Sequence, residues 1–406
     1  MAKSENISRI DLDAIRAARE VGRAVVEHTP VTPSAYLSQQ FGGQIILKAE
    51  NLQRTGSFKI RGAINKLHRL NELKRHGVVA GSAGNHAAGL AFAAQHFGVK
   101  CEIFIPRGAS LTKIAACKNY GGIVIDGGES IDTAVAMAKS RAVETGMAFC
   151  HPYDDVDVVA GQGTLGLELL EDISELSLVI VPLGGGGLIS GTALAIKQQR
   201  PEVKIIGVQI SSCAPYIYGN APSGAVPTLA DGIAVKRPGD VTRPLIENWV
   251  DELVDVDENS VADAMMALLE RSKMYVEGGG AVGVSALLVS RVKPAKNGKT
   301  CVVLSGGNVD MGLIPNLIRR YETKAGRRAL LFARVSDRPG ALAEFLSVIA
   351  KSGANIIEVS HDREGLDLHV LETGVQVVLE VRSRDHTAEI ISIVKSAGFE
   401  ISEMTS

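Results

Sequence analysis

The sequence has few cysteines, no excess of charge of either sign and no long apolar run. The cysteines are scattered, with no Cys-x-x-Cys pair, which argues against a disulfide framework or a zinc site; they are Cys101, Cys117, Cys150, Cys213 and Cys301. The formal net charge is −2, and no run of lysine and arginine dominates any segment. We therefore expect no nucleic-acid or membrane partner. The first 15 residues lack the apolar core of a signal peptide. The scattered cysteines are typical of reduced core residues, which predicts a cytoplasmic protein.

Strand-like apolar runs alternate with amphipathic helices from residue 10 to about 320. A chain of 406 residues is too long for one ordinary core, which predicts two or three domains. Several runs are almost continuously apolar, as parallel strands covered on both faces are. The predicted strands lie at residues 45–49, 77–80, 101–105, 122–125, 177–181, 204–210 and 300–304. This pattern predicts an open α/β fold, in which ligands bind at the carboxyl ends of the strands.

The composition changes near residue 318, where a polar and basic segment begins. We expect residues 321–327 to form a solvated linker after a core of residues 1–320, whose smaller subdomain covers about 53–157. Residues 328–406 then predict strand, helix, strand, strand, helix and strand, at 329–335, 341–352, 355–360, 375–381, 386–397 and 399–402. The order β-α-β-β-α-β is that of a small ferredoxin-like domain.

Two segments at predicted strand–helix junctions carry polar groups suited to chemistry. In GSFKIRGA, residues 56–63, Lys59 stands at the start of a helix. The helix dipole and desolvation would lower its pKa and favour the neutral amine that imine formation requires. In GSAGNH, residues 81–86, the free amides of a helix start can bind a carboxylate, and Asn85 can bond to a hydroxyl. Taken alone, these segments also fit an exposed lysine and a tight turn.

Two further segments are rich in glycine. The run GGGGL at 184–188 follows a predicted strand, and its backbone could approach a phosphate closely. It is no dinucleotide fingerprint, because the third glycine position holds Ile189 or Ser190 and the next strand ends at Gln209 without an acidic residue. A purely structural tetraglycine is unfavourable, since four flexible residues lose entropy on folding and we expect no contact to compensate for it. In LSGGN, residues 304–308, Ser305 would lie at the carboxyl edge of the sheet, where a ring nitrogen could meet it, although the segment also fits an ordinary turn.

Together these segments resemble the fold-type II pyridoxal-phosphate (PLP) enzymes, most closely the threonine/serine dehydratase branch that includes serine racemase. The resemblance covers about residues 10–320 and rests on motifs that follow the family's order: SFKIRGA, SAGNHAAG, GQGT at 161–164, GGGGLISG, ADGIAV at 230–235, EGGGAVG at 277–283 and SGGNVD. Residues 328–404 resemble an ACT domain, a small-molecule sensor, through DRPGAL at 337–342. The expected fold is therefore α/β, with two open α/β domains and a C-terminal ferredoxin-like (βαββαβ) ACT domain.

The resemblance implies a role for each matching residue. Lys59 would form an imine with PLP, Asn85 would bind the ring oxygen O3′, and Ser305 would bind the ring nitrogen. Phe58 and Gly232 would flank the ring. The phosphate would be held by Gly184, Gly185, Gly186, Gly187 and Leu188. The substrate carboxylate would be bound by Ser82, Ala83, Gly84, Asn85 and His86. Relatives of the serine racemase kind have a metal-binding carboxylate after the strand that here ends in Gln209, where this chain offers no acid. We expect no magnesium site, and whether the chain binds a monovalent cation stays open.

The implied reaction is the deamination of L-threonine or L-serine by elimination of water. Lys59 would remove the Cα proton, and the cofactor's phosphate would protonate the leaving hydroxyl. The neutral Ser305 leaves the ring a weaker electron sink than an aspartate would, which favours prompt elimination. One alternative is a serine racemase with side dehydratase activity, in which Ser82 is the acid on the opposite face. Another is a non-catalytic amino-acid sensor, in which the ACT domain is the working part.

The C-terminal turn 337–341 leads directly into a predicted helix, so its amides could bind a carboxylate. Asp337 or Asn355 could bind an ammonium group. The expected effector-binding residues are Asp337, Pro339, Gly340, Ala341, Asn355 and Ile356. We expect an amino-acid effector at a subunit interface of a homodimer or homotetramer, with isoleucine and valine as natural candidates. A simple dimerisation module is the alternative.

Overall fold

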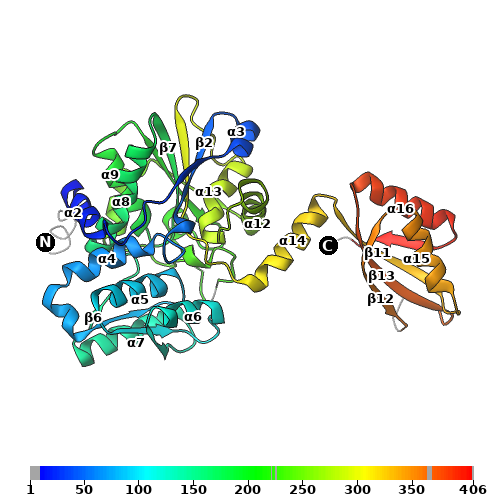
Figure 1. Ribbon diagram of the computed structural model, residues 1–406, viewed down its shortest axis with the longest axis horizontal. Helices are drawn as coiled ribbons and strands as arrows, with labels where there is room; N and C mark the ends of the chain where they lie inside the picture. The colour runs from blue at the N-terminus through cyan, green and yellow to red at the C-terminus, as the bar shows by residue number, and fades with distance from the viewer. Residues whose placement is uncertain (1–9, 221, 225, 364–367, 405–406) are drawn as a thin grey trace. The chain divides into compact units, whose positions relative to one another are not determined.

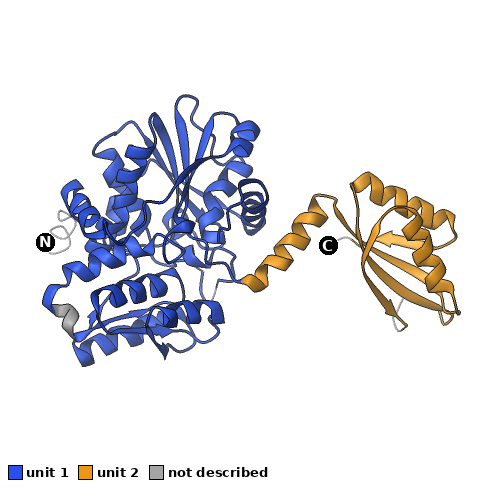
Figure 2. Ribbon diagram, in the orientation of Figure 1, with its two compact units in different colours: residues 1–310 blue, residues 311–406 orange. Residues whose placement is uncertain are grey.

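The computed structural model describes residues 10–220, 222–224, 226–363 and 368–404, without the side chains of residues 73–75. Residues 1–9, on which the N-terminal prediction partly rests, lie outside the described residues. The chain forms two compact units, residues 1–310 and 311–406 (Figure 2). The boundary precedes the expected linker, because helix α14, Ile314–Lys324, belongs to the second unit and includes residues 321–324.

The larger sheet of the first unit has the strand order β1-β2-β10-β7-β8-β9 (Figure 1). Its first pair is antiparallel and the others are parallel. Side chains of β7 and β10 alternate between the two faces: Val179 and Cys301 pack against helices α8 and α9, whereas Ile180 and Val302 face α13. The strands are β1 Val31–Pro33, β2 Gln44–Ala49, β7 Leu176–Pro182, β8 Lys204–Ile210, β9 Glu252–Val256 and β10 Lys299–Leu304.

The smaller sheet has the order β5-β4-β3-β6, with all pairs parallel. Ala80 and Ile103 pack with helices α4 and α5 on one face, and Val79 and Phe104 pack with α7 on the other. The strands are β3 Val78–Gly81, β4 Cys101–Ile105, β5 Ile123–Asp126 and β6 Ala148–Phe149. Both sheets thus have helices on both faces, as their apolar strands predict.

Many helices begin at a Ser or Asp N-cap whose side chain accepts from the first turn, as Ser130 does for α7 and Asp155 for α8. The helices of the first unit are α2 Leu12–Gly22, α3 Ala35–Phe41, α4 Lys59–Arg69, α5 Asn85–Phe97, α6 Leu111–Asn119, α7 Ile131–Thr145, α8 Val156–Asp172, α9 Gly187–Lys197, α10 Pro215–Tyr218, α11 Thr242–Trp249, α12 Glu258–Ala267 and α13 Gly278–Leu288. Shorter helical turns are η1 Glu50–Leu52, η2 Asn71–His76, η3 Asp231–Ile233 and η4 Leu268–Ser272, with η5 Met311–Leu313 opening the second unit.

The second unit contains a four-stranded antiparallel sheet of order β12-β13-β11-β14. Helices α15 and α16 pack on it around Phe345 and Ile390. Its elements are β11 Arg328–Ser336, α15 Ala341–Lys351, β12 Asn355–Asp362, β13 Glu372–Glu380, α16 Arg384–Ser396 and β14 Glu400–Glu403. This is the predicted βαββαβ order.

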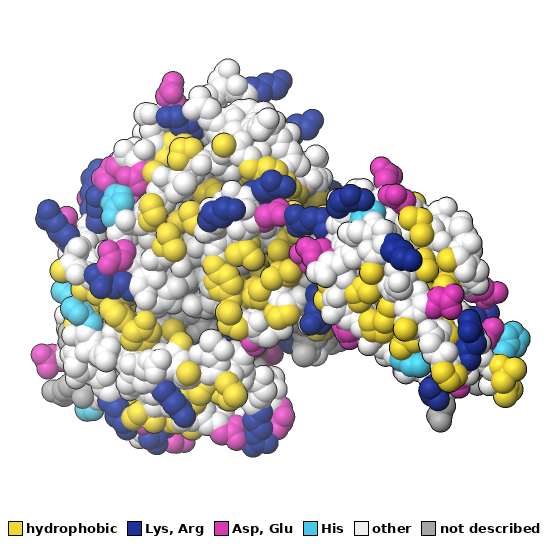
Figure 3. Space-filling model, turned by 45° about the vertical axis from the view of Figure 1, so that its right-hand side comes forward, with side chains coloured by type: hydrophobic (Ala, Val, Ile, Leu, Met, Phe, Trp, Pro, Cys, Tyr) yellow, Lys and Arg dark blue, Asp and Glu magenta, His cyan; other side chains and the backbone are white. Residues whose placement is uncertain are grey.

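All five cysteines are free and buried. Among the described residues, no helix has the length and apolarity needed to span a bilayer. Lysine and arginine are interspersed with aspartate and glutamate over the face drawn in Figure 3.

Candidate active site

One cavity of about 1300 Å³ in the first unit contains every core residue that the resemblance singled out. It opens where β3, β7 and β10 end at their carboxyl edges, as ligand sites of open α/β sheets do. Its lining includes Phe58, Lys59, Ser82, Ala83, Gly84, Asn85, His86, Gly184, Gly185, Gly186, Gly187, Leu188, Gly232 and Ser305. Segments up to about 250 residues apart in the sequence therefore meet in one place.

Lys59 is the first residue of α4 and reaches into this cavity. Its Nζ donates to the carbonyl oxygen of Pro152 at 2.8 Å and lies 5.1 Å from the centre of the Phe58 ring. Burial lowers the pKa of Lys59 to about 8, against an opposing effect of the Glu277 carboxylate. A lysine with this pKa is partly neutral near pH 7, as a nucleophilic or basic amine must be.

Backbone hydrogen bonds fix the Lys59 segment relative to Ser305. The amide of Phe58 donates to the Ser305 carbonyl at 3.2 Å, and the amide of Gly307 donates to the Gly56 carbonyl at 2.8 Å. Ser305 itself is buried. The lysine and the hydroxyl therefore hold a set separation without depending on side-chain contacts.

The turn at Ser82 opens α5 with its polar groups partly used by the protein. The Ser82 Oγ accepts from the Gly84 amide at 3.3 Å, and the Ser82 amide donates to Phe104 at 3.0 Å. His86 donates its Nε2 proton to the Cys150 carbonyl at 3.0 Å, since a carbonyl can only accept. Burial, aided by the Lys59 charge, lowers the pKa of His86 to about 3. His86 is therefore a neutral donor held by the protein.

The glycine run is required by packing as well as by any ligand. A Cβ on Gly185 would stand 2.2 Å from the Tyr153 ring, and one on Gly184 would stand 2.8 Å from the Ile233 Cα. The expectation that a structural tetraglycine lacks compensating contacts is thus wrong: neighbouring chain fills the space. The Gly185 carbonyl accepts from Thr242 Oγ1 at 2.8 Å, which holds the loop in place.

The loop still has the geometry of a phosphate cradle. Gly186 has φ +93°, and α9 begins at the next residue, so the amides of its first turn lack acceptors within the helix. With the half-buried Lys59 and the neutral Ser305 in the same cavity, the residues fit PLP.

Glu277 is the main site residue that the sequence did not single out. It lies in the EGGGAVG motif, directly before α13, and lines the cavity. Burial, aided by Asp231, raises its pKa to about 7, while a hydrogen bond from Asn85 opposes the shift. A single acidic residue before a glycine run carries no sequence signal of burial.

Charged residues at the cavity lining also went unpredicted. Lys113 of α6 pairs with Asp231 of η3, and Lys236 pairs with Asp132 of α7 at 3.6 Å. Both pairs connect the helices of the smaller sheet to residues 231–236. The lining cations suit the anionic groups of a phosphorylated cofactor and a carboxylate substrate.

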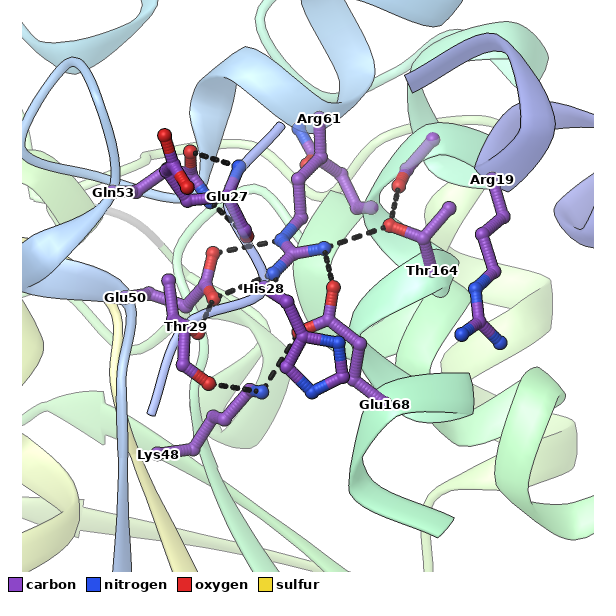
Figure 4. A network of polar contacts seen from close by, with 12 residues as sticks. Arg19, Glu27, His28, Thr29, Lys48, Glu50, Gln53, Arg61, Thr164 and Glu168 are labelled. Carbon is purple, nitrogen blue, oxygen red and sulfur yellow. Dashed lines mark hydrogen bonds and ion pairs between the residues drawn. The ribbon is translucent and has the colours of Figure 1, made fainter. Parts of the chain in front are cut away.

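A buried ionic network anchors α4 two residues after Lys59 (Figure 4). The Arg61 guanidinium forms paired bonds to Glu50, at 2.7 and 2.8 Å, and to Glu168, at 2.6 and 2.9 Å. Lys48 is fully buried and contacts Glu168 at 2.7 Å. Although burial opposes the shift, the Arg61 charge lowers the pKa of Glu168. The network joins β2, η1, α4 and α8, so it fixes the base of the Lys59 helix.

The expected effector residues of the second unit do not meet within one chain. Asp337 follows the last residue of β11, whereas Asn355 pairs with Glu380, which pairs with the first residue of β11. Eight residue steps along a strand separate the two ends by roughly 26 Å. At the end of the sheet where Asp337 lies, Gly340 has φ +90° and caps α15, and Asp337 pairs with Arg363 at 3.3 Å. No group of three or more His, Cys, Asp or Glu side chains suited to a metal occurs within the described part of the chain.

A half-buried lysine of lowered pKa, a glycine loop before a helix and a neutral hydroxyl line one cavity, an arrangement that fits a phosphorylated aldehyde cofactor. The family model of the pyridoxal-phosphate dependent enzymes matches residues 23–306, and the chain belongs to that family. The ACT domain model matches residues 329–399. The predicted fold class and cofactor are thereby confirmed.

Individual relatives and solved structures show which members of the family this chain is similar to. The chain is 45% identical to L-threonine ammonia-lyase of Thermotoga maritima over 399 residues, covering 97% of this chain and 99% of that protein. Among solved structures it is similar to maize serine racemase, with TM-score 0.72 and 36% identity over 78% of this chain and 98% of that one. It is also similar to processed threonine deaminase isoform 2 of Solanum lycopersicum, with TM-score 0.70 and 32% identity over 76% and 86%.

Proposed function

We propose that this chain is a PLP-dependent threonine ammonia-lyase, a carbon–nitrogen lyase that converts L-threonine to 2-oxobutanoate and ammonia, and L-serine to pyruvate and ammonia. One water leaves the substrate and one is consumed in hydrolysis, so the net products are the oxo acid and ammonia. The observation that carries the proposal is the meeting of the half-buried Lys59, the glycine loop and Ser305 in one cavity. The identity of 45% to a threonine ammonia-lyase over nearly the whole chain supports it.

The cavity residues have separate tasks in this proposal. Lys59 carries the cofactor, the amides of residues 184–188 hold its phosphate, and Asn85 and Ser305 meet the ring oxygen and ring nitrogen. When bound, PLP withdraws electrons from the substrate's Cα. The Lys59 amine then takes the Cα proton, for which a pKa of about 8 suits it near neutral pH. The Ser82 turn and the start of α5 hold the substrate carboxylate.

Serine racemisation is a second candidate. Ser82 lines the same cavity as Lys59, so it could protonate Cα from the other side. The likeness to maize serine racemase supports this reading. Chiral separation of products from L-serine distinguishes the two activities: accumulation of D-serine faster than pyruvate would favour the racemase.

The second unit binds a free amino acid in this proposal and thereby changes the rate of the first. The ACT match supports amino-acid binding. Because Asp337 and Asn355 lie at opposite ends of the sheet, one small ligand can touch both only if they come from two chains. We therefore propose that the chain forms a homo-oligomer. We also propose that it acts in the cytoplasm.

Steady-state assays of the purified holoenzyme test the activity. L-threonine and L-serine are supplied separately, and oxo acid and ammonia are quantified for the parent, Lys59→Ala and Lys118→Ala, an exposed lysine as matched control. We expect K59A to lose at least about four decades of turnover, since a covalent and a basic role are both lost, and K118A to match the parent. Near-normal activity of K59A, or no oxo acid from the parent, would contradict the proposal.

A further inference from the structure

The side chain of Asn308 links the Lys59 segment to the start of α5. Its Nδ2 donates to the Thr55 carbonyl at 2.9 Å and to the Asn85 Oδ1 at 2.6 Å. On the other side, the Asn85 Nδ2 donates to the Glu277 Oε1 at 2.6 Å. Thr55, Asn308, Asn85 and Glu277 thus form one chain of hydrogen bonds at the cavity.

The Thr55 carbonyl and the Glu277 carboxyl group fix the orientation of the two side-chain amides that lie between them. A backbone carbonyl can only accept, so the Asn308 atom that faces Thr55 must be the NH₂ group. That group also donates to Asn85, so the Asn85 atom that accepts must be its amide oxygen. The Asn85 NH₂ then points to the Glu277 carboxyl group, whose Oε1 accepts. Asn85 is left with one free N–H and with its oxygen already bonded to Asn308.

We propose that Asn308 and Glu277 are positioning residues that orient the Asn85 amide so that it offers an N–H, and not its oxygen, to the bound cofactor. This inference rests on the proposed function, in which Asn85 meets the ring oxygen of PLP. An N–H donor stabilises that oxygen in its ionised form. An inverted amide would offer an acceptor and disfavour the anion.

Two motif glycines make room for this arrangement. A Cβ on Gly56 would lie 2.4 Å from the Asn308 Oδ1, and a Cβ on Gly306 would lie 2.3 Å from the Glu277 Oε1 and 3.1 Å from the Asn85 Nδ2. Contacts below 3.0 Å cannot persist, so any side chain at these positions would displace the bonded groups. The first glycine of GSFKIRGA and the first glycine of SGGNVD therefore leave the space that the hydrogen-bond chain occupies.

Four variants of the full chain test the proposal. Asn308→Asp keeps the shape but removes both donated hydrogen bonds, and Asn297→Asp makes the same change at an exposed position. Glu277→Gln keeps an oxygen acceptor for Asn85, whereas Glu277→Met removes it at similar volume. PLP affinity is measured by absorbance titration of each apoprotein, with thermal unfolding of the apoprotein as a check on folding. The absorbance of bound PLP is then followed against pH.

We expect N308D and E277M to bind PLP about tenfold or more weakly, because each leaves Asn85 free to invert. The pH at which the bound cofactor's absorbance changes should rise in both. N297D should match the parent, and E277Q should stay within about threefold of it, since an amide oxygen still accepts. Parent-like affinity and spectrum in N308D would overturn the inference. If N308D does not fold, equal affinities of E277Q and E277M would overturn it. A parent that binds no PLP would refute the proposed function instead.

Discussion

Burial moves the pKa values of Lys59 and Glu277 toward neutrality from opposite sides. The amine falls to about 8 and the carboxyl rises to about 7, in both cases chiefly because the charged form is desolvated. Both groups line the cavity. Small changes of pH near neutrality therefore alter the charge state of the apoprotein's site.

The lowered pKa of Lys59 predicts how PLP attachment depends on pH. Only the neutral amine attacks a carbonyl, so the attachment rate to apoprotein should rise about tenfold per pH unit below pH 8 and level off above it. An ordinary lysine, with a pKa of about 10.4, would show no plateau until about two units higher. Stopped-flow absorbance between about pH 6 and pH 10 measures this profile. A rate still rising tenfold per unit at pH 9 would contradict the assignment of the lysine.

The raised pKa of Glu277 predicts a pH-dependent stability of the apoprotein. Between the ordinary 4.5 and about 7, the unfolded chain releases a proton that the folded chain retains, so stability falls as pH rises through this window. The loss is complete above pH 7 and is of order 3 kcal/mol. Glu277→Gln should raise the Tm of apoprotein by a few degrees at pH 8 and leave it unchanged at pH 4. Exposed Glu389→Gln is the control; a Tm gain for E277Q that is equal at both pH values would refute this account.

Among the elements, α4, α8 and α9 cross at glycines. A Cβ on Gly161 of α8 would stand 2.5 Å from the Arg61 carbonyl, and one on Gly191 of α9 would stand 2.6 Å from the Gly163 amide. The GQGT motif is thus a packing motif in this fold. These close crossings bring the Arg61 side chain between Glu50 and Glu168, where it anchors the helix that begins at Lys59.

Removing the Arg61 charge should destabilise the first unit strongly. Arg61→Met leaves the buried Glu50 without its ionic partner and Glu168 with Lys48 alone, at a cost of about 3–5 kcal/mol in the free energy of unfolding. Arg69→Met, on the same helix but largely exposed, should change it by about 0.5 kcal/mol or less. Urea denaturation of both apoproteins measures the difference. Equal stabilities of R61M and R69M would contradict a supporting role for the network.

The sequence predicts the strands better than it predicts the reasons for its motifs. Every predicted strand is present, and its ends lie within two residues of the prediction except at the start of β13, which begins three residues earlier, because apolar runs are a strong signal. The three-residue β1, the two-residue β6 and the half-buried β9 were missed, since none of them has a clear periodicity. The cavity lining follows from the motifs, but Glu277 and the Arg61 network do not, because burial of a charge depends on distant segments. Likewise, only the packed structure places Tyr153 against Gly185.

Across the whole molecule, two separately packed units carry the proposed catalysis and the proposed regulation. Gly340 has φ +90° at the effector turn, and Gly398 has φ +92° elsewhere in the same unit, with open space around both. Alanine at either costs about 1–2 kcal/mol of backbone strain. Titrating isoleucine, valine, threonine and serine against the full chain should show an effector whose half-saturating concentration shifts in Gly340→Ala and not in Gly398→Ala. If both shift equally, or no amino acid alters the rate, the turn does not bind an effector.

The attachment of PLP to Lys59 is the central claim, and chemical trapping tests it most directly. Purified protein is reduced with borohydride, which fixes the cofactor to the amine that holds it, and the digested peptides are mapped by mass spectrometry. The account predicts the phosphopyridoxyl mass on the peptide that contains Lys59, and its absence from an apoprotein treated in the same way. The same mass on another lysine, such as Lys113 in the same cavity, or on no peptide at all, would contradict the account.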